Sequence, residues 1–259
     1  MTIDTAAIDD LNLEGALNFR AVRGIEGEGG RTIRDGALFR CGTLEALSDA
    51  SIREVAGLGI RTVFDLRSAR ERELYPSRLV GAEGLDVIDF HHEGTLGDLA
   101  IVLQSPDCRP DDARRSMIGI YREFPEAFAP IFGDVLARLV NQPTPALVHC
   151  MAGKDRTGAM VSLILSALGA SRDAIVEDYL GTNRHTAALI ESLADRRERR
   201  DVPPLAPEVV RPVLTADADY LAAMFASIDA GWGGVDAYLE RGLGLDPASR
   251  ERLRANMLA

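Results

Sequence analysis

A short apolar strand that runs through a glycine-bearing loop into a helix is the feature that most constrains how this chain can fold. Residues 146–149 read Ala-Leu-Val-His and follow the breaker-rich run 141–145, which predicts a buried strand. Gly153 lies in the loop, and the apolar pattern after it predicts a helix over residues 156–168. A unit of this kind is typical of α/β domains.

Three further short runs of β-branched and apolar residues, at 37–39, 62–64 and 87–90, predict strands. Helical patterns lie between them, and strands that alternate with helices predict a parallel sheet with crossover connections. The expected fold class is α/β, with a central, mostly parallel sheet flanked by helices and with extra C-terminal helices. Neither a repeat nor a linker divides the 259 residues. We therefore expect residues 1–259 to form a single domain, in which 205–259 are a helical C-terminal extension.

Helical periodicity dominates the rest of the chain. An apolar stripe from Met117 to Leu139 contains Pro125, which is expected to begin a second helix after a break near Phe124, because proline is tolerated in a first helical turn. Beyond residue 168 the expected helices run from a Ser171 cap to residue 179 or 180, over 187–197 and 216–230, and from Asp246-Pro247 to the last residues.

Charge and composition narrow the function classes. Asp and Glu number 40 against 29 Lys and Arg, a net charge of −11, which argues against a nucleic-acid-binding protein. Any anionic ligand must be held by a local positive site that works against this overall field. Three widely spaced cysteines favour a reducing compartment, and the first residues lack the pattern of a secretory signal. A cytoplasmic location is expected, without a transmembrane segment; export without a recognisable signal is the alternative.

The loop after residue 149 has the chemistry of an anion site. Cys150 ends the strand, and Arg156 stands six positions later, at the start of the helix. Backbone N–H groups of such a loop can point inward as a nest, the helix N-terminus adds partial positive charge, and Arg156 can bind two oxygens as a planar fork. Cysteine thiols in such surroundings ionise readily, and the thiolate is a nucleophile. The loop can therefore bind a phosphoryl group and attack it through Cys150.

A lone cysteine at the end of a strand is most often a small buried apolar side chain. The catalytic interpretation is favoured here because several residues recur at a defined spacing. They are His149, Cys150, Gly153, Arg156, Thr157 and Gly158.

This His-Cys-x5-Arg-Thr-Gly segment resembles the signature of the protein-tyrosine phosphatase superfamily. The Gly153-Lys154-Asp155-Arg156 form is similar to the bacterial tyrosine phosphatase B-like branch of tyrosine and phosphoinositide phosphatases. The resemblance covers almost the whole chain, although only the signature is highly specific. Supporting segments are Asn18-Phe19-Arg20, followed by Ala21 where the family usually has Asp, then 36–40, 64–68, and 238–245.

The resemblance implies a metal-independent phosphomonoester hydrolase with no cofactor, in which Cys150 forms a cysteinyl-phosphate and Arg156 clamps the phosphate. Thr157 would hydrogen-bond the Cys150 sulfur, and His149 would hold the loop. Asp65, after an expected strand, is either a substrate contact or half of an ion pair that closes a turn. The main-chain amides that would bind phosphate belong to Met151, Ala152, Gly153, Lys154, Asp155 and Arg156.

Two places in the chain are candidates for the general acid, the group that gives a proton to the leaving oxygen. Asp155 lies inside the loop, as that branch is thought to use, whereas Asp111 and Asp112 lie about as far before Cys150 as the Asp of a mobile loop does in many relatives. Protonation of the leaving oxygen needs such a group. Asp155 is favoured over the other two.

Two features bear on the substrate. Lys154 is expected at the rim of the loop, where its charge could meet a second phosphate of an inositol lipid; the alternative is a general electrostatic role. The C-terminal helices around 216–230 either pack as core or cover the pocket as a lid. The expected substrates are phosphorylated proteins or phosphoinositides, with inorganic phosphate as product; the sequence does not choose between them and does not give the oligomeric state. Two other function classes remain open, a phosphate-binding pseudophosphatase and a rhodanese-type sulfur transferase.

Overall fold

The computed structural model describes residues 13–92, 103, 105, 107–142 and 145–259. A five-stranded sheet with the order β1-β2-β5-β3-β4 lies at its centre. Strands β2, β5, β3 and β4 are parallel, and only β1 at the edge runs antiparallel to its neighbour β2. The predicted mostly parallel α/β fold is confirmed. The strands are β1 (Arg20–Ala21), β2 (Leu38–Cys41), β3 (Thr62–Asp65), β4 (Asp86–Asp89) and β5 (Ala146–His149).

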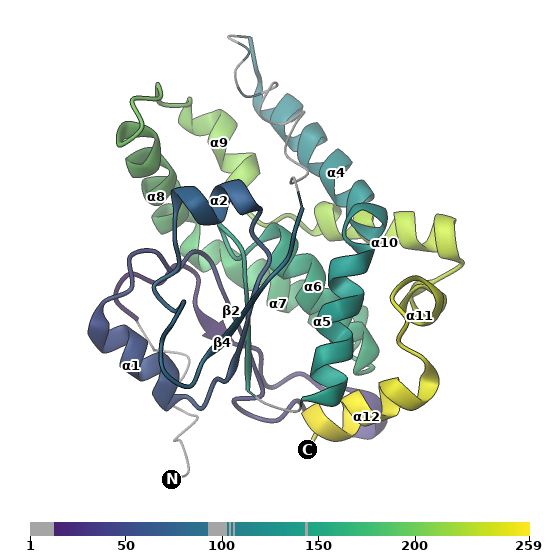
Figure 1. Ribbon diagram of the computed structural model, residues 1–259. Helices are drawn as coiled ribbons and strands as arrows, with labels where there is room; N and C mark the ends of the chain where they lie inside the picture. Colours follow the sequence, from purple (N-terminus) through teal and green to yellow (C-terminus); the bar gives the residue numbers. More distant parts are fainter. Residues whose placement is uncertain (1–12, 93–102, 104, 106, 143–144) are drawn as a thin grey trace.

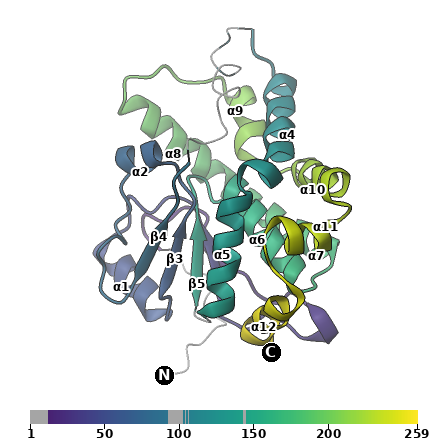
Figure 2. The same cartoon turned by 45° about the vertical axis from the view of Figure 1, so that its right-hand side comes forward.

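The central strands are buried on both faces, which is why they read as continuous apolar runs. Alternate residues point to opposite sides. Phe39, Val63 and Leu147 pack in one apolar cluster with residues of α1 (Asp49–Gly57). Phe64 and Val148 pack on the other side with α5 (Ala129–Asn141) and α6 (Asp155–Ala167), and Figure 2 shows α5 lying across that face.

The helix break in the long apolar stripe lies later than predicted. Helix α4 (Pro110–Ala127) continues through Pro125, and the chain breaks at Phe128, where φ is −109° and ψ is 5°. The proline in the first turn of α5 is Pro130. Pro125 is buried with the rest of the apolar stripe, so tertiary packing carries the helix through it. The prediction that Pro125 begins a helix is wrong.

The C-terminal half is helical, as predicted, and two expected caps are present. The side chain of Ser171 accepts a hydrogen bond from the amide of Ala174, and Asp246 accepts one from the amide of Ser249.

Among the described residues, the remaining elements are η2 (Glu28–Gly30), α2 (Ala69–Leu74), α7 (Arg172–Leu180), η3 (Gly181–His185), α8 (Thr186–Glu198), α9 (Pro207–Leu214), α10 (Ala218–Trp232), α11 (Val235–Ala237), η4 (Tyr238–Gly242) and α12 (Pro247–Met257).

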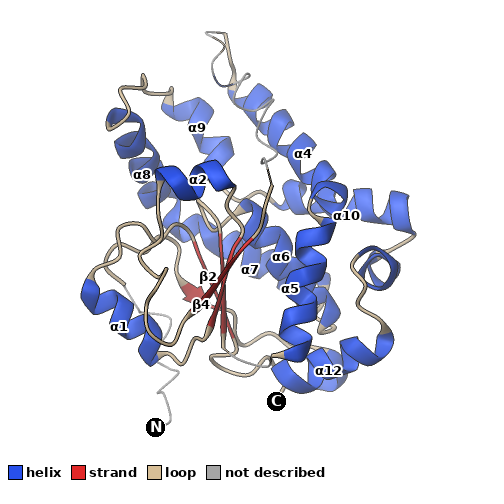
Figure 3. Ribbon diagram, viewed as in Figure 1, coloured by secondary structure: helices blue, strands red, loops and turns tan. Residues whose placement is uncertain are grey.

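Helices α4, α8 and α9 extend beyond one end of the sheet, opposite the end where α12 and the C-terminus lie (Figures 1 and 3). Helix α9 packs against both α4 and α8. In the described part of the chain, no helix is both long and apolar enough to span a membrane. The three helices frame the end of the sheet at which β5 leads into the Cys150 loop.

Candidate active site

The carboxyl ends of three neighbouring strands place Cys41, His149 and Asp65 in one row. His149 of β5 is paired in parallel register with Cys41 of β2 on one side and with Asp65 of β3 on the other. Cys150 follows His149 directly, and the residue is only 1% exposed. The loop therefore begins where open α/β sheets bind their ligands.

Gly153 is the one loop residue whose backbone requires glycine. Its φ is +65°, and a Cβ atom there would lie 2.4 Å from the carbonyl carbon and oxygen of Cys41. A contact that short is with main chain, which cannot swing aside. Gly153 thus allows the loop to press against the end of β2.

Two side chains from distant segments hold the outer side of the loop. Asn18 Nδ2 donates to the carbonyl oxygens of Ala152 and Gly153, both at 3.0 Å. Arg40 Nη2 donates to the Gly153 carbonyl at 3.0 Å, and Arg40 is paired with Asp178 of α7. Because the C=O and N–H of a trans peptide point in opposite directions, carbonyls turned outward leave the following amides turned into the loop.

Arg20 links this support to α7 and η3. Its Nη2 donates to the Asp178 carbonyl at 3.0 Å and to the Thr182 hydroxyl at 3.3 Å. Burial, followed by the charge of Arg40, lowers the pKa of Arg20 to about 9. The segments containing Asn18, Arg20 and Arg40, which the sequence offered only as supporting resemblance, therefore stabilise the loop.

The guanidinium of Arg156 is held end-on by Glu71 of α2. Nη1 lies 2.6 Å from Glu71 Oε2, Nη2 lies 2.7 Å from Oε1, and Nη1 also donates to the Leu66 carbonyl at 3.0 Å. A guanidinium carries five N–H donors. The Nε–H and one Nη2–H, which lie along one edge, have no hydrogen-bond partner among the described residues. That edge fits two oxygens of a phosphate.

Glu71 is ionised through the neutral range. Burial alone would raise the pKa of its carboxyl, but the hydrogen bonds and charge of Arg156 outweigh burial, and the pKa falls to about 2. Glu71 in turn raises the pKa of Arg156, although burial opposes this. The clamp is thus a fixed ion pair before any phosphate arrives.

Glu71 was not among the residues predicted from the sequence. Its signal is a capping box, since Ser68 and Glu71 stand three positions apart at the start of α2. The Ser68 amide donates to Glu71 Oε2 at 2.7 Å, and the Glu71 amide donates to the Ser68 hydroxyl at 3.3 Å. The capping box fixes the carboxylate that orients Arg156.

Replacing Glu71 with glutamine is expected to lower kcat/KM by about tenfold or more, mainly through KM. One oxygen becomes an NH2 group, which cannot accept from Arg156, and a hydrogen bond between charged groups contributes roughly 1.5–3 kcal/mol. Steady-state kinetics on an aryl phosphate, together with inhibition by inorganic phosphate, measure the effect. Glu73→Gln, an exposed change on the same helix, is the control. An unchanged KM in Glu71→Gln would contradict the orienting role.

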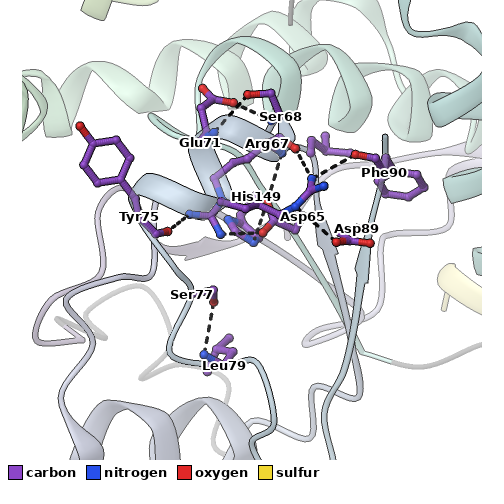
Figure 4. Close-up of polar contacts among 12 residues, drawn as sticks. Asp65, Arg67, Ser68, Glu71, Tyr75, Ser77, Leu79, Asp89, Phe90 and His149 are labelled. Carbon is purple, nitrogen blue, oxygen red and sulfur yellow. Dashed lines mark hydrogen bonds and ion pairs between the residues drawn. The ribbon is translucent and has the colours of Figure 1, made fainter. Parts of the chain in front are cut away.

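Asp65 is enclosed by Arg67 and His149 (Figure 4). Arg67 donates from Nε to Oδ1 at 2.8 Å, from Nη2 to Oδ2 at 2.6 Å, and from its amide to Oδ1 at 3.1 Å. Burial opposes ionisation of Asp65, but His149 and Arg67 outweigh it and lower the pKa of the carboxyl. The residue is almost fully buried. Of the two roles left open for Asp65, this geometry favours the ion pair.

His149 is a neutral, buried imidazole. Burial lowers its pKa to about 4, and the charge of Asp65 only partly offsets this. His149 Nε2 lies 3.5 Å from Asp65 Oδ1. Neither ring nitrogen makes a hydrogen bond to the described residues. The Cys150 backbone acts on the pKa of this ring, so His149 faces the first residue of the loop, and its expected loop-holding role stays a prediction.

Thr157 departs from the expectation as well. It is fully buried in the first turn of α6, and among the described residues its Oγ1 has no hydrogen-bond partner. The expected bond to the Cys150 sulfur is therefore not made in this structure. A buried hydroxyl without a hydrogen-bond partner destabilises the fold by about 1–3 kcal/mol. The hydroxyl of Thr157 is therefore a costly group that remains available to donate a hydrogen bond near the loop.

Asp155 begins α6, directly after the loop, and its side chain is 22% exposed. Its Oδ1 accepts from the Tyr121 hydroxyl at 3.0 Å and lies 3.1 Å from Lys154 Nζ. Asp111 and Asp112 lie instead in the first turn of α4, whose N-terminal end points away from the sheet (Figure 1). Asp112 is occupied with Arg109 and Arg115. Position favours Asp155 over the α4 carboxylates.

Lys154 does not lie at the rim, and that expectation is wrong. Its side chain is fully buried, and Nζ donates to the carbonyl of Val213 at the end of α9 and, at 3.4 Å, to that of Thr215. Its ammonium lies 5.3 Å from the centre of the Tyr220 ring. The two carbonyls come from the end of α9 and the residue that follows it. The spacing of residues within the Cys150 loop gives no information on such a distant contact. The sequence does mark Lys154 as unusual, because it is the only lysine and every other residue counted with it as Lys or Arg is arginine.

An ion pair joins the end of α8 to the loop that follows β2. Arg196 Nε lies 3.2 Å from Glu45 Oε1, and its guanidinium carbon lies 5.2 Å from the centre of the Tyr75 ring. Arg196 thus joins α8 to the segment that follows β2, and the Lys154 contacts join α9 to the Cys150 loop. The described residues include no group of three or more side chains suited to hold a metal ion.

Comparison with known proteins agrees with this geometry. A family model described as tyrosine phosphatase family matches residues 11–259. A tyrosine-protein phosphatase of Cupriavidus necator is 34% identical over 96% of this chain and 89% of its own length. The triple specificity protein phosphatase PtpB of Mycobacterium tuberculosis is 34% identical over 95% of this chain and 98% of its own length, and a tyrosine-protein phosphatase of Nostoc commune is 27% identical over 85% and 74%. The chain therefore belongs to the tyrosine phosphatase family.

Proposed function

We propose that this protein hydrolyses phosphomonoesters, phosphotyrosine in proteins among them, through a cysteinyl-phosphate on Cys150. The observation that carries this proposal is the prearranged Arg156, whose two remaining N–H donors lie along one edge that no described residue occupies. A tetrahedral dianion fits between that edge, the inward amides of the loop and the N-terminus of α6. Family membership supports the same reaction.

In the first step the Cys150 thiolate attacks phosphorus, and the bond from phosphorus to the ester oxygen breaks. Asp155 gives its proton to the leaving oxygen, so the alcohol or phenol departs neutral. The loop amides and Arg156 stabilise the charge on the transferring oxygens. Their positions are fixed beforehand by Asn18, Arg40 and Glu71, so little reorganisation accompanies the reaction.

In the second step water attacks the cysteinyl-phosphate, and the phosphorus–sulfur bond breaks to release inorganic phosphate and the thiolate. Asp155, now a carboxylate, takes the proton of that water. The Thr157 hydroxyl, which has no partner among the described residues, is a suitable donor to the departing sulfur. This hydrogen bond would satisfy a buried hydroxyl that is otherwise destabilising.

Rapid acid quench during turnover of a phosphotyrosine peptide tests the intermediate. Mass spectrometry of the quenched protein is expected to show one added phosphoryl group on the peptide that contains Cys150. Cys41→Ala is the matched control, because it removes the neighbouring buried thiol and should leave the labelled peptide unchanged. Phosphate binding without turnover or labelling would indicate a binding protein instead.

Phosphoinositides remain candidate substrates, but Lys154 does not select them. Because its ammonium is buried against α9 and Asp155, Lys154→Met is expected to reduce kcat/KM equally on a phosphotyrosine peptide and on a soluble phosphoinositide. The two substrates are measured side by side at fixed ionic strength. Arg211→Met, which removes an exposed charge from α9, is the control. A loss on the lipid that exceeds the loss on the peptide by about tenfold would instead reveal a second-phosphate contact.

Other observations support the remaining expectations. The α10 residues Tyr220, Leu221 and Met224 belong to the same apolar cluster as β5, which supports a single phosphatase domain. All three cysteines are free thiols, in keeping with a reducing, cytoplasmic environment. The burial of these α10 residues also supports the core alternative for 216–230 over the lid alternative. A cover over the pocket is proposed instead for α8 and α9, from the contacts of Arg196 with Glu45 and of Lys154 with Val213.

A further inference from the structure

Two buried tyrosines form a hydrogen-bonded pair that ends on Asp155. Tyr121 comes from α4 and Tyr179 from α7, and both side chains are fully buried. Their hydroxyl oxygens are 2.7 Å apart, and the Tyr121 hydroxyl lies 3.0 Å from Asp155 Oδ1. The pair is outside the signature, and the reaction described above makes no use of it.

The direction of these hydrogen bonds follows from counting protons. A phenol has one hydrogen to donate, and Tyr121 gives it to Asp155. The Tyr121 oxygen must then accept from Tyr179. Burial raises the pKa of both phenols well above the usual value, and the charge of Asp155 raises both further. Both hydroxyls therefore keep their protons at any working pH.

The two oxygens of Asp155 are consequently unlike. Oδ1 faces two donors, the Tyr121 hydroxyl and Lys154 Nζ. Oδ2 makes no hydrogen bond to any described residue. A proton on Oδ1 would point at groups that are themselves donors, so a proton carried by this carboxyl belongs on Oδ2.

We propose that Tyr121, backed by Tyr179, is a positioning residue for Asp155, which keeps Oδ1 as an acceptor and leaves the transferable proton on Oδ2. The inference rests on the proposed function, in which Asp155 is the general acid. Packing makes the arrangement rigid. The Tyr121 ring lies with its centre 4.9 Å from that of Phe124 and 5.5 Å from that of Tyr220, so its hydroxyl has little freedom to move away.

The test is the dependence of kcat/KM on the leaving group. A good leaving group such as dinitrophenol departs without a proton, whereas phenol needs one. Tyr121→Phe removes only the hydroxyl. We expect it to lower kcat/KM about tenfold or more on phenyl phosphate and less than about threefold on dinitrophenyl phosphate. The ratio of the two values within one preparation does not depend on how much of the protein is folded.

Tyr238→Phe is the matched control. It removes another buried hydroxyl that contacts α4, since Tyr238 donates to the Pro125 carbonyl at 2.7 Å, but it leaves Asp155 alone. Its substrate ratio should equal that of the unmodified protein. Tyr179→Phe should shift the ratio in the same direction as Tyr121→Phe, by a smaller factor. If neither Tyr121→Phe nor Tyr179→Phe moves the ratio, the positioning role is wrong.

Asp155→Asn separates this inference from the proposed function. If Asp155→Asn shows the leaving-group effect and Tyr121→Phe does not, only the inference fails. If Asp155→Asn shows no such effect, Asp155 is not the general acid, and both fail. In the supporting outcome, adding Tyr121→Phe to Asp155→Asn causes no further change in the ratio, because the hydroxyl acts through a carboxyl that is no longer there.

Discussion

Changing Cys150 to serine is expected to reduce turnover by about 10⁴-fold or more while the fold is kept. A serine hydroxyl is barely ionised under conditions in which a cysteine in a positive loop is a thiolate. The neighbouring His149 cannot compensate as a base, because it is buried against Asp65 and its pKa is lowered to about 4. Kinetics on a phosphotyrosine peptide measure the loss, and thermal unfolding checks the fold.

Phosphate should still bind to this variant, since Arg156 and the loop amides are untouched. Calorimetric titration with inorganic phosphate tests that point. Substituting serine for Cys41, the buried cysteine beside the loop, should leave turnover within a few-fold of the starting value, because that thiol is not proposed to react. Burial and the neighbouring Cys150 raise the pKa of the Cys41 thiol, which keeps it protonated. Residual hydrolysis by Cys150→Ser that survives thiol alkylation would contradict the proposed nucleophile.

Arg156→Lys is expected to lower kcat/KM by about 10²- to 10⁴-fold, although the positive charge is retained. An ammonium is a compact group with three donors and cannot serve Glu71, the Leu66 carbonyl and two phosphate oxygens at once. Loss of two charged hydrogen bonds, at roughly 1.5–3 kcal/mol each, gives this range. Steady-state kinetics and the inhibition constant of inorganic phosphate measure it.

Arg70→Lys is the control for Arg156→Lys, because Arg70 is an exposed residue on α2, the helix that carries Glu71. It should leave both kinetic constants unchanged. A loss smaller than about tenfold in Arg156→Lys would show that charge alone holds the phosphate. The fork geometry would then have no part in binding.

Local pattern was enough to predict the strand that carries the site. The run 146–149 is a strand with the predicted bounds, because a short apolar segment between breakers has few alternatives. Cys150 and Arg156 were found for a related reason, since a short loop connects this strand to a helix and brings two residues six positions apart to one site. Family resemblance then supplied their expected roles.

The parts that could not be predicted depend on contacts between distant segments. Glu71 meets Arg156 across 85 positions, and Tyr121 meets Asp155 across 34. Lys154 was expected at the rim because of its place in the loop, and the carbonyl at the end of α9 instead holds its ammonium in the interior. Pro125 was expected to start a helix on propensity alone, and packing of the apolar stripe prevailed over it.

The loop supports described above also set the order in which the protein can become active. Asn18 reaches Gly153 across 135 positions, and Arg40 reaches Asp178 across 138. Contacts of such high sequence separation form slowly, and on the ribosome they must wait for the later segment to emerge. A nascent chain that has completed Arg156 holds every reacting group but still lacks α7, to which Arg20 and Arg40 are anchored. Activity should therefore develop only after roughly the first two thirds of the chain has been made, which keeps an unfinished, exposed thiolate from acting as a phosphatase.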